Sequence, residues 1–415
     1  MNPVASILAG ADRCVMCGLC LPHCPTFSLT RHEAESPRGR IMLMQALAAG
    51  KMEADAPLLR HLDNCLACRS CERMCPSLVE YGRLIDQTRT LLQEQGKRQQ
   101  PIVVRRLLDA IEEPDQLRQK AKALRLYQQS GVQWLARSSG LLKGLKLAGL
   151  EQQLPEVPPI EEFAPHYPAT GARRGAVALF TGCLGSILDQ AALRASIRLL
   201  NRLGYEVHIP PAQQCCGGLH HHQGELASAK RLALANIAAF ATDQYEAILF
   251  TASGCGAQLA DYGVLIGQDG EALANKVCDI DSFLAGVEWP AHLVAAPLAA
   301  TVAVHDPCTL HNVLRQSEAP YRLLARIPQL QVVALEGNRS CCGAAGIYHL
   351  THAPTAAALR APKLTAAAAN GAAYLASANF GCALHIAAGL REQGQAIEVL
   401  HPVVLLDRQL TLAGW

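Results

Sequence analysis

Cys14-x2-Cys17-x2-Cys20-x3-Cys24-Pro25 and Cys65-x2-Cys68-x2-Cys71-x3-Cys75-Pro76 are two matching cysteine runs that decide the fold of the amino-terminal region. Three cysteines spaced by two can wrap one face of an iron-sulfur cube, and a fourth that is followed by proline turns away to reach a neighbouring cluster. We therefore expect two [4Fe-4S] clusters with exchanged fourth ligands. Cluster 1 takes Cys14, Cys17, Cys20 and Cys75, and cluster 2 takes Cys65, Cys68, Cys71 and Cys24.

A pair of structural zinc sites is the alternative interpretation of these runs, because sets of four cysteines also bind zinc. Zinc needs only two pairs of cysteines, however. The third cysteine of each run, and the fourth with a proline after it, favour iron-sulfur clusters instead.

Length and composition narrow the class of protein. A chain of 415 residues is too long for one ordinary core and predicts about three domains, and its 50% hydrophobic residues are enough to fill them. The net charge is only +2 and charged residues make up 17%, so a nucleic-acid partner bound through a basic face has no support. The 17 cysteines include metal-ligand runs rather than scattered pairs, which indicates a reducing compartment.

Two segments bear on a membrane location. Residues 1–11 lack a basic n-region, so we expect no signal peptide. Residues 364–390 carry no charged residue apart from His385, but Asn, Gly and Ala interrupt them, and they are predicted to form a buried strand, loop and helix. We expect a cytoplasmic protein that meets a membrane only from the surface or through a partner.

The first two predicted segments are helical. Residues 1–95 form a helical ferredoxin domain with two [4Fe-4S] clusters, in which Ser36 caps a helix that begins at Pro37. Arg38 and Arg40 are candidates to donate hydrogen bonds to cluster sulfur or to contact a partner, with a solvated first turn as the alternative for at least one. Residues 96–175 form a basic amphipathic segment, expected to pack on its own domain rather than on a membrane, and a proline-rich linker.

Beyond residue 175 the chain repeats itself, as repeat 1 (176–290) and repeat 2 (291–415). Cysteine landmarks recur with offsets of 125, 126 and 127 residues, which chance does not readily produce. We predict an α+β multidomain protein, in which two pseudo-twofold-related α/β repeats with parallel sheets follow the helical domain. The landmarks are Cys183, Cys215, Cys216 and Cys255 in repeat 1, and Cys308, Cys341, Cys342 and Cys382 in repeat 2.

Each landmark follows a predicted strand, and ligands bind at the carboxyl ends of the strands in parallel α/β sheets. We therefore expect the four cysteines of each repeat to converge on one loop site. Gly217 and Gly343 are expected to let the backbone pass close to whatever the cysteines hold. Each site holds either a further iron-sulfur cluster or metal, or else zinc, a disulfide or nothing. The predicted strands are 176–180, 205–209, 247–251, 301–305, 331–335 and 373–377.

Histidines and one further cysteine lie near these landmarks. A loop cluster beside the repeat 1 site is the preferred interpretation of His220, His221 and His222, with metal ligation as the alternative. His305 either orients a ligand thiolate by hydrogen bonding or belongs to an ordinary strand-end turn. Cys278 is expected to be a buried free thiol.

With these residues the chain resembles the iron-sulfur subunits of glycolate oxidase along most of its length, and its duplicated half resembles the cysteine-rich CCG domain of heterodisulfide reductase, anaerobic glycerol-3-phosphate dehydrogenase and lactate-utilisation proteins. The resemblance rests on the two runs, Pro37-Arg38-Gly39-Arg40-Ile41, His61-Leu62-Asp63, Thr251-Ala252-Ser253-Gly254-Cys255-Gly256 and Cys341-Cys342-Gly343. It implies an electron-transfer subunit at the inner face of the bacterial cytoplasmic membrane. Its FAD-binding flavoprotein partners would oxidise a 2-hydroxy acid, glycolate by best match, and its electrons would pass toward the quinone pool.

The chain departs from the full CCG motif, since Ala252 and Asn379 stand where that motif has a further cysteine. This departure argues against a catalytic thiol-disulfide reductase of the heterodisulfide reductase kind. Electron transfer in a D-lactate or glycerol-3-phosphate dehydrogenase system stays open, and so does a zinc-bound scaffold without a redox function. Because no triad, phosphate-binding glycine loop or carboxylate pair stands out, we do not expect this chain to oxidise a substrate alone.

Overall fold

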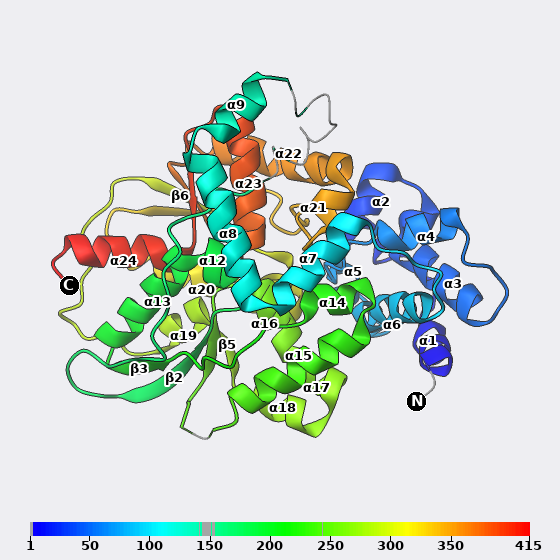
Figure 1. The fold of residues 1–415 in the computed structure, drawn as a ribbon, viewed down its shortest axis with the longest axis horizontal. Coiled ribbons are helices and arrows are strands. Elements are labelled where there is room, and N and C mark those ends of the chain that lie inside the picture. Colours follow the sequence, from blue (N-terminus) through cyan, green and yellow to red (C-terminus); the bar gives the residue numbers. More distant parts are fainter. Residues whose placement is uncertain (1–2, 141, 143–150, 152–153, 243) are drawn as a thin grey trace.

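The structure is a computed structural model that describes residues 3–140, 142, 151, 154–242 and 244–415. The chain folds into a helical amino-terminal region and two α/β halves, and its two termini lie on opposite sides of the molecule (Figure 1). The predicted fold class is therefore confirmed.

Short helices surround the two cysteine runs in the amino-terminal region. They are α1 (Pro3–Asp12), η1 (Leu21–His23), α2 (Pro25–Thr30), η2 (Glu33–Glu35), α3 (Pro37–Ala48), α4 (Ala56–Asp63), α5 (Ser70–Arg73) and α6 (Tyr81–Glu94). Ser36 caps α3 as predicted, because its side-chain oxygen accepts a hydrogen bond from the Gly39 amide at 3.0 Å. Ile7 of α1 and Ile85 of α6 meet in a small apolar core between the helices.

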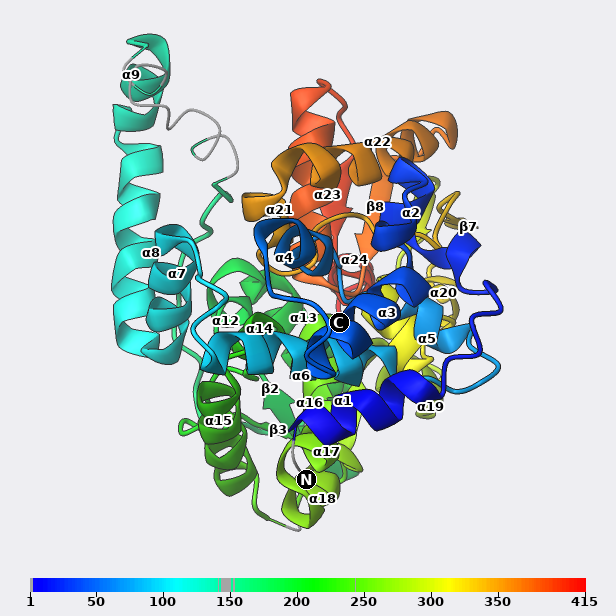
Figure 2. The same ribbon diagram turned by 90° about the vertical axis from the view of Figure 1, so that its right-hand side faces the viewer.

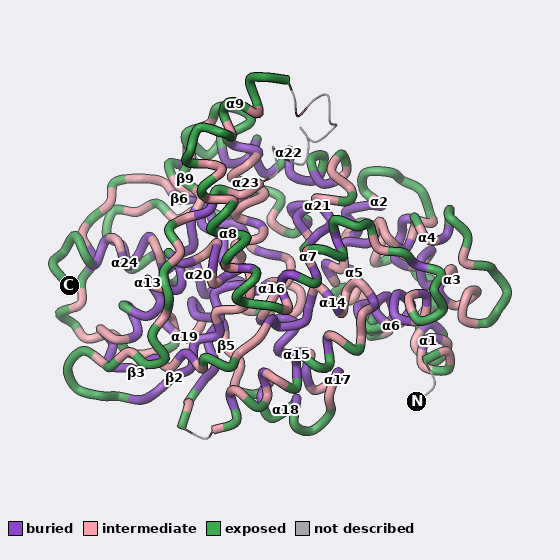
Figure 3. Tube along the Cα trace, viewed as in Figure 1, coloured by how far each residue is buried: buried purple, intermediate pink, exposed green. Residues whose placement is uncertain are grey.

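Three further helices run along one side of the molecule (Figure 2): α7 (Ile102–Glu112), α8 (Pro114–Gln129) and α9 (Val132–Ser138). Val104, Leu108 and Ile111 of α7 join the apolar core of repeat 1. The segment was expected to pack on its own domain, and α7 instead packs on the neighbouring repeat. Most of α8 and α9 is exposed (Figure 3), whereas the predicted helical positions Leu141, Leu145 and Leu147 lie outside the described residues.

Repeat 1 contains the parallel strands β2 to β5 of a five-stranded sheet in the order β1-β3-β2-β4-β5, and the antiparallel edge strand β1 comes from the predicted linker. Its apolar strands lie between helices, so β2 and β4 are buried along their full length. The strands are β1 (His166–Tyr167), β2 (Gly175–Phe180), β3 (Tyr205–His208), β4 (Ile248–Phe250) and β5 (Val277–Asp279). The helices are α12 (Gly185–Leu188), α13 (Gln190–Arg202), α14 (Gly218–Gln223), α15 (Leu226–Ala239), α16 (Ser253–Ala260), α17 (Tyr262–Ile266), α18 (Gln268–Ala274) and α19 (Ile280–Gly286).

Repeat 2 contains a fully parallel four-stranded sheet in the order β7-β6-β8-β9. Its middle strands occupy the same positions in the sheet as β2 and β4 of repeat 1, as expected for a duplicated unit. The strands are β6 (Thr301–His305), β7 (Gln331–Ala334), β8 (Tyr374–Ser377) and β9 (Glu398–Leu400). The helices are η3, a π-helix (Thr309–Leu314), α20 (Ala319–Leu324), α21 (Tyr348–Thr351), α22 (Ala353–Ala369), α23 (Phe380–Glu392) and α24 (Pro402–Leu412).

The two repeats pack through equivalent helices, as a pseudo-twofold axis requires. Helix α24 of repeat 2 lies on α13 of repeat 1, and α19 of repeat 1 lies on α20 of repeat 2. One apolar core of buried side chains spans both repeats. At the edge of this contact Asp407 is buried and accepts hydrogen bonds from Arg198 at 2.5 Å and from Arg202 at 2.6 Å.

The six strands predicted from the sequence are all present, within one or two residues of their expected ends. The strands β1, β5 and β9 were not predicted, because two or three residues are too few to show a period-two pattern. The apolar stretch 364–390 forms the end of α22, then β8 and most of α23, as the sequence indicates. Across the described residues, every helix is too short or too polar to cross a membrane.

Candidate metal centres

Four buried cysteines of the amino-terminal region line one cavity, which we call the inner cavity. Cys65, Cys68 and Cys71 reach it from the second run, and Cys24, the last cysteine of the first run, reaches it from the start of α2. None of the four is more than 9% exposed. Three cysteines of one run and the fourth of the other thus surround the same space.

A second cavity, the outer cavity, adjoins the first. Cys14, Cys17 and Cys20 of the first run line it together with Cys75 of the second, and Cys71 lies at the boundary between the two cavities. Cys17 is exposed and the other three are half-buried. The chain thus places both predicted groups of four around separate but adjacent spaces, of which the outer one is open to solvent. Ligation itself stays a prediction.

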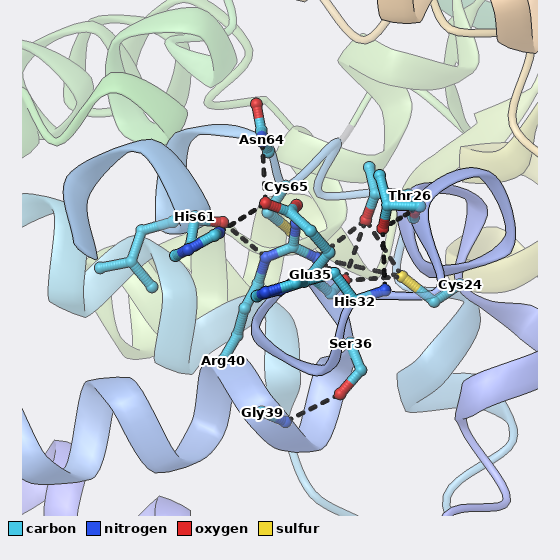
Figure 4. A network of polar contacts seen from close by, with 12 residues as sticks. Cys24, Thr26, His32, Glu35, Ser36, Gly39, Arg40, His61, Asn64 and Cys65 are labelled. Carbon is cyan, nitrogen blue, oxygen red and sulfur yellow. Dashed lines mark hydrogen bonds and ion pairs between the residues drawn. The ribbon is translucent and has the colours of Figure 1, made fainter. Parts of the chain in front are cut away.

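A buried ion-pair network supports the inner cavity (Figure 4). The guanidinium of Arg40 is 1% exposed and donates to the Glu35 carboxylate, to Thr26 Oγ1 at 3.0 Å and to Cys24 Sγ at 3.9 Å. His61 Nδ1 lies 2.6 Å from the same carboxylate. Sequence analysis singled out Arg40 but missed Glu35, whose partners come from α3 and α4.

Burial and charge set the protonation of these groups. Burial would lower the pKa of Arg40, but the neighbouring Tyr81, Cys65, Cys24 and Glu35 raise it above its ordinary value, so this guanidinium stays charged. Burial raises the pKa of the Cys68 and Cys71 thiols well above the ordinary range. A cation that replaces the thiol protons would relieve this penalty, which is why a thiophilic metal group fits the cavity chemically.

The four cysteines of repeat 1 converge where β2, β3 and β4 end. Cys183 Sγ lies 3.3 Å from Cys215 Sγ, and Cys216 contacts both Cys215 and Cys255. Hydrogen bonds from Cys215 and Cys255 lower the pKa of Cys216 below its usual value. The predicted loop site of repeat 1 is therefore assembled.

The cysteines of repeat 2 form a similar row, from Cys308 through Cys341 and Cys342 to Cys382. A histidine joins the row, since a ring nitrogen of His305 and the sulfur atoms of Cys342 and Cys382 all lie within 4.8 Å of one another. His305 is buried at the end of β6, and its Nδ1 lies 3.0 Å from Ser377 Oγ. Imidazole and thiolate together are a donor set that suits zinc or iron.

The inner cavity and the repeat 2 site lie next to each other. Cys68 packs in one cluster of buried side chains with Cys341, and Cys308 lies against the same cluster. Asn312 of η3 holds this contact, because its side-chain amide donates to the Cys68 carbonyl at 2.9 Å. Cys68 of the second run thus shares one buried cluster with Cys341 of repeat 2, although the two positions differ by more than 200 residues.

Comparison with known proteins agrees with this division of the chain. A model of a 4Fe-4S dicluster domain matches residues 10–79, and a model of a cysteine-rich domain matches residues 177–260 and 302–387. A third model, described as the linker region of the glycolate oxidase iron-sulfur subunit, matches residues 101–154.

Relatives match along almost the whole chain. The probable glycolate oxidase iron-sulfur subunit of Bacillus subtilis (strain 168) is 36% identical over 97% of this chain and 94% of its own length. The glycolate oxidase iron-sulfur subunit of Escherichia coli (strain K12) is 31% identical over 91% of this chain and 90% of its own length. The chain belongs to the family of glycolate oxidase iron-sulfur subunits. Lactate utilization protein A of Bacillus pumilus (strain SAFR-032) is 29% identical over 56% of this chain and 98% of its own length.

Ala252 and Asn379 are the two positions at which this chain lacks the further cysteine of the full CCG motif. Both precede helices at the contact between the repeats, where the Ser253 amide donates to the Ala378 carbonyl at 3.1 Å. The Asn379 side chain caps α23 by accepting from the Gly381 amide at 3.1 Å. A polar cap therefore occupies the place where the fuller motif has a cysteine.

The three histidines of α14 connect repeat 1 to other helices. His220 Nε2 lies 2.9 Å from Glu112 of α7, and His222 Nδ1 lies 3.1 Å from Asp86 of α6. His221 Nδ1 lies 3.3 Å from Gln258 of α16. The histidines thus lie on a short helix and not in the expected loop, and a role beside the cysteine site stays a prediction.

The glycines after the cysteine pairs occupy positions where a side chain would not fit. Gly217 and Gly343 have φ angles of 79° and 89°, which other residues rarely adopt. A Cβ atom on Gly343 would lie 2.6 Å from the Ala356 carbonyl, and one on Gly217 would lie 3.1 Å from the Ala229 carbonyl. An added side chain would therefore collide with the helices α22 and α15, and the predicted approach of the backbone to a group held by the cysteines stays a prediction.

Proposed function

We propose that this chain is the electron-transfer subunit of a membrane-associated complex that oxidises glycolate. FAD-binding flavoprotein subunits oxidise the substrate, and this chain carries their electrons toward the quinone pool from the inner face of the cytoplasmic membrane. The observation that carries the proposal is the pair of adjoining cavities, each lined by three cysteines of one run and the last cysteine of the other. Family membership supports the choice of glycolate as the substrate of the complex.

Two [4Fe-4S] clusters fit these cavities. Cys14, Cys17, Cys20 and Cys75 would hold cluster 1 in the outer cavity, and Cys65, Cys68, Cys71 and Cys24 would hold cluster 2 in the inner one. When bound, a cluster of this kind supplies one-electron transfer at a potential set by hydrogen bonds and by solvent exposure.

The residues around the inner cavity adapt it to a negatively charged group. The guanidinium of Arg40 supplies a permanent positive charge beside Cys24, and the Glu35 carboxylate holds it in place. The Ala67 amide and the Tyr81 hydroxyl donate to Cys65 Sγ at 3.4 Å and 3.6 Å. The outer cavity is more exposed, so we expect the two clusters to differ in potential.

Repeat 2 would hold a third centre. We assign His305, Cys342 and Cys382 to it, because these three buried donors already lie within one coordination sphere. Cys341 contacts Cys342 and completes a set of four donors. The side chain of Ser377 would fix the ring orientation of His305 through Nδ1.

The cluster assignment can be tested on anaerobically prepared protein by iron and sulfide analysis and electron paramagnetic resonance. Two cubanes give about eight iron atoms per chain. The variant Cys24→Ala should remove the same signal as Cys68→Ala, and Cys75→Ala the same signal as Cys17→Ala. Cys278→Ala is the matched control, because this half-buried thiol belongs to neither cavity. If Cys24→Ala instead removed the signal that Cys17→Ala removes, the exchanged assignment would be wrong.

The role in the complex can be tested by reconstitution. This chain alone should not oxidise glycolate, whereas the flavoprotein subunits that co-purify with it should reduce its clusters when glycolate is added. Reduction by D-lactate or glycerol-3-phosphate in place of glycolate would assign a different substrate. Turnover of glycolate by the isolated chain would overturn the proposal.

A further inference from the structure

The two cysteine runs have the same backbone conformation at equivalent positions, which differ by 51 residues. Met16 and Ala67 have φ angles of 55° and 50°, and Gly18 and Arg69 have φ angles of 85° and 56°. Such positive angles are uncommon outside glycine, so their recurrence shows that both loops fold alike. Side chains at equivalent positions can therefore be compared directly.

The loop of the second run is covered by the protein itself. Leu66 is 7% exposed and packs in a buried cluster with Cys341, Tyr348 and Leu359 of repeat 2. Ser70 is 5% exposed at the start of α5. Ala67 and Ser70 are small, as fits a loop pressed against a neighbouring domain.

The loop of the first run carries larger apolar side chains that stay in solvent. Val15 occupies the position of Leu66 and is 68% exposed, and Leu19 occupies the position of Ser70 and is 57% exposed. Met16, which replaces Ala67, is 38% exposed. Leu78 lies between Ser77 and Val79, which line the outer cavity, and is 70% exposed, with a φ angle of 50°. Bulky apolar residues at the rim of a cavity are typical of a surface that a partner covers.

We propose that these four side chains, Val15, Met16, Leu19 and Leu78, form the docking surface for the flavoprotein subunit that delivers electrons to this chain; the inference rests on the function proposed above. The second run supports this inference, because repeat 2 covers its loop at the inner cavity, and the loop of the first run has the same conformation. The outer cavity lacks such a cover among the described residues, and Cys17 of its rim is exposed.

The position of the surface favours an electron donor over other occupants. Cys68 of the inner cavity already contacts the thiols of repeat 2, so that side of the amino-terminal region is occupied. The outer cavity is therefore the side on which a partner can approach the predicted clusters closely. An anionic membrane surface is disfavoured, because the guanidinium of Arg38, which lines the outer cavity, is already paired with the Glu33 carboxylate at 2.7 Å.

The test replaces residues of the first loop by the residues at the equivalent positions of the second loop. The double variant Met16→Ala and Leu19→Ser places the residues of the second run into the first. Alanine is compatible with the positive φ at position 16 because Ala67 already adopts it, and position 19 is not among the positive-φ positions that would strain a serine. The affinity of the full chain for the co-purifying flavoprotein subunits is then measured, together with iron content and paramagnetic spectra. The control variant Leu234→Ser and Val264→Ala removes exposed apolar side chains from α15 and α17, away from both cavities.

We expect the double variant to bind the flavoprotein subunits at least tenfold more weakly, with iron content and spectra unchanged, and the control to bind as the wild type does. Equal binding by the double variant would overturn the inference. Wild-type protein that lacks iron or does not bind the flavoprotein would instead contradict the proposed function. The two failures can thus be told apart.

A second measurement decides the case in which the double variant loses iron. A photoreactive p-benzoylphenylalanine in place of Leu78 should cross-link to a flavoprotein subunit in the assembled complex. Cross-links to a second copy of this chain, or to vesicles of phosphatidylethanolamine and phosphatidylglycerol, would show that another surface or partner occupies the rim and would overturn the inference.

Discussion

The two repeats have the same order of parallel strands, but they differ in the residues at the strand ends beside their cysteines. In repeat 1 the strand-end partners are Phe180 and Phe250, which pair across β2 and β4. In repeat 2 the equivalent partners are His305 and Ser377, which pair across β6 and β8. An aromatic pair offers no ligand atom, whereas an imidazole held by a hydroxyl offers one. The duplicated frame of cysteines is therefore compatible with two different sites.

The helix beside each cysteine site adds a second difference between the repeats. Lys363 of α22 is 1% exposed beside the repeat 2 cysteines, and its ammonium donates to the Gly337 carbonyl. In repeat 1 the buried Asn236 of α15 holds the Cys215 carbonyl at 3.0 Å without a charge. Repeat 2 therefore has an imidazole and a buried basic side chain beside its cysteines where repeat 1 has neither, and this makes repeat 2 the better candidate for a metal centre.

The largest expected effect comes from removing one thiol of each site. Cys342→Ala should abolish the third centre and lower the metal content below that of the wild type, because the remaining donors cannot enclose a cation. Cys216→Ala, its counterpart in repeat 1, should leave the metal content unchanged. Metal analysis of both variants, with paramagnetic spectra to confirm that the two cubanes remain, checks the comparison. An equal loss of metal in both variants would show that the repeats are alike.

A smaller effect should follow from the hydroxyl that orients His305. Ser377→Ala removes the partner of Nδ1 and leaves the ligand atoms in place. Such partners of metal-bound histidines typically contribute about 10–100-fold to metal affinity. Competition with a chelator measures this change, and Ser282→Ala, in a helix of repeat 1, serves as the control. Unchanged affinity in Ser377→Ala would mean that His305 is not a ligand.

The sequence predicted those features of the two repeats that depend on short stretches of chain. Strands β2 and β6 follow from short apolar runs, and the cysteines after them follow from their spacing. The contact of Cys68 with Cys341 has no local signal, because it depends on how the amino-terminal region docks on repeat 2. The same holds for Glu35, an ordinary charged residue by sequence that becomes buried only when α3 and α4 close over it.

His305 shows a different limit of sequence analysis. Its place at the end of a predicted strand was visible, and so was its position ahead of Cys308. Its proximity to Cys382 depends on the parallel pairing of β6 with β8, which sets His305 opposite Ser377. An alignment of the two repeats on their cysteines shows the exchange with Phe180, and this is the signal that could have found the site.

The smallest predicted effect concerns the helix caps through which the repeats meet. Asp279 caps α19 in repeat 1 by accepting from the Ser282 amide at 3.1 Å, and His401 caps α24 in repeat 2 by accepting from the Val403 amide at 3.3 Å. His401 Nε2 also donates to the Thr251 carbonyl of repeat 1 at 3.0 Å. The ring must therefore be neutral, with its proton on Nε2, and burial lowers the pKa of His401 to about 3.

This lowered pKa makes stability depend on pH with a definite sign. The unfolded chain binds a proton at His401 below its ordinary pKa of about 6.5, whereas the folded chain does not until about pH 3, so this contribution is complete above pH 6.5 and is lost as the pH falls. Between pH 7.5 and 5.5 the free energy of unfolding should fall by about 1.4 kcal/mol more in the wild type than in His401→Asn, which keeps a polar cap. Urea unfolding at both pH values measures the difference, and His292→Asn, at an exposed position, is the control. An equal pH dependence in wild type and His401→Asn would mean that Asp281, 3.9 Å from the ring, keeps His401 protonated in the fold.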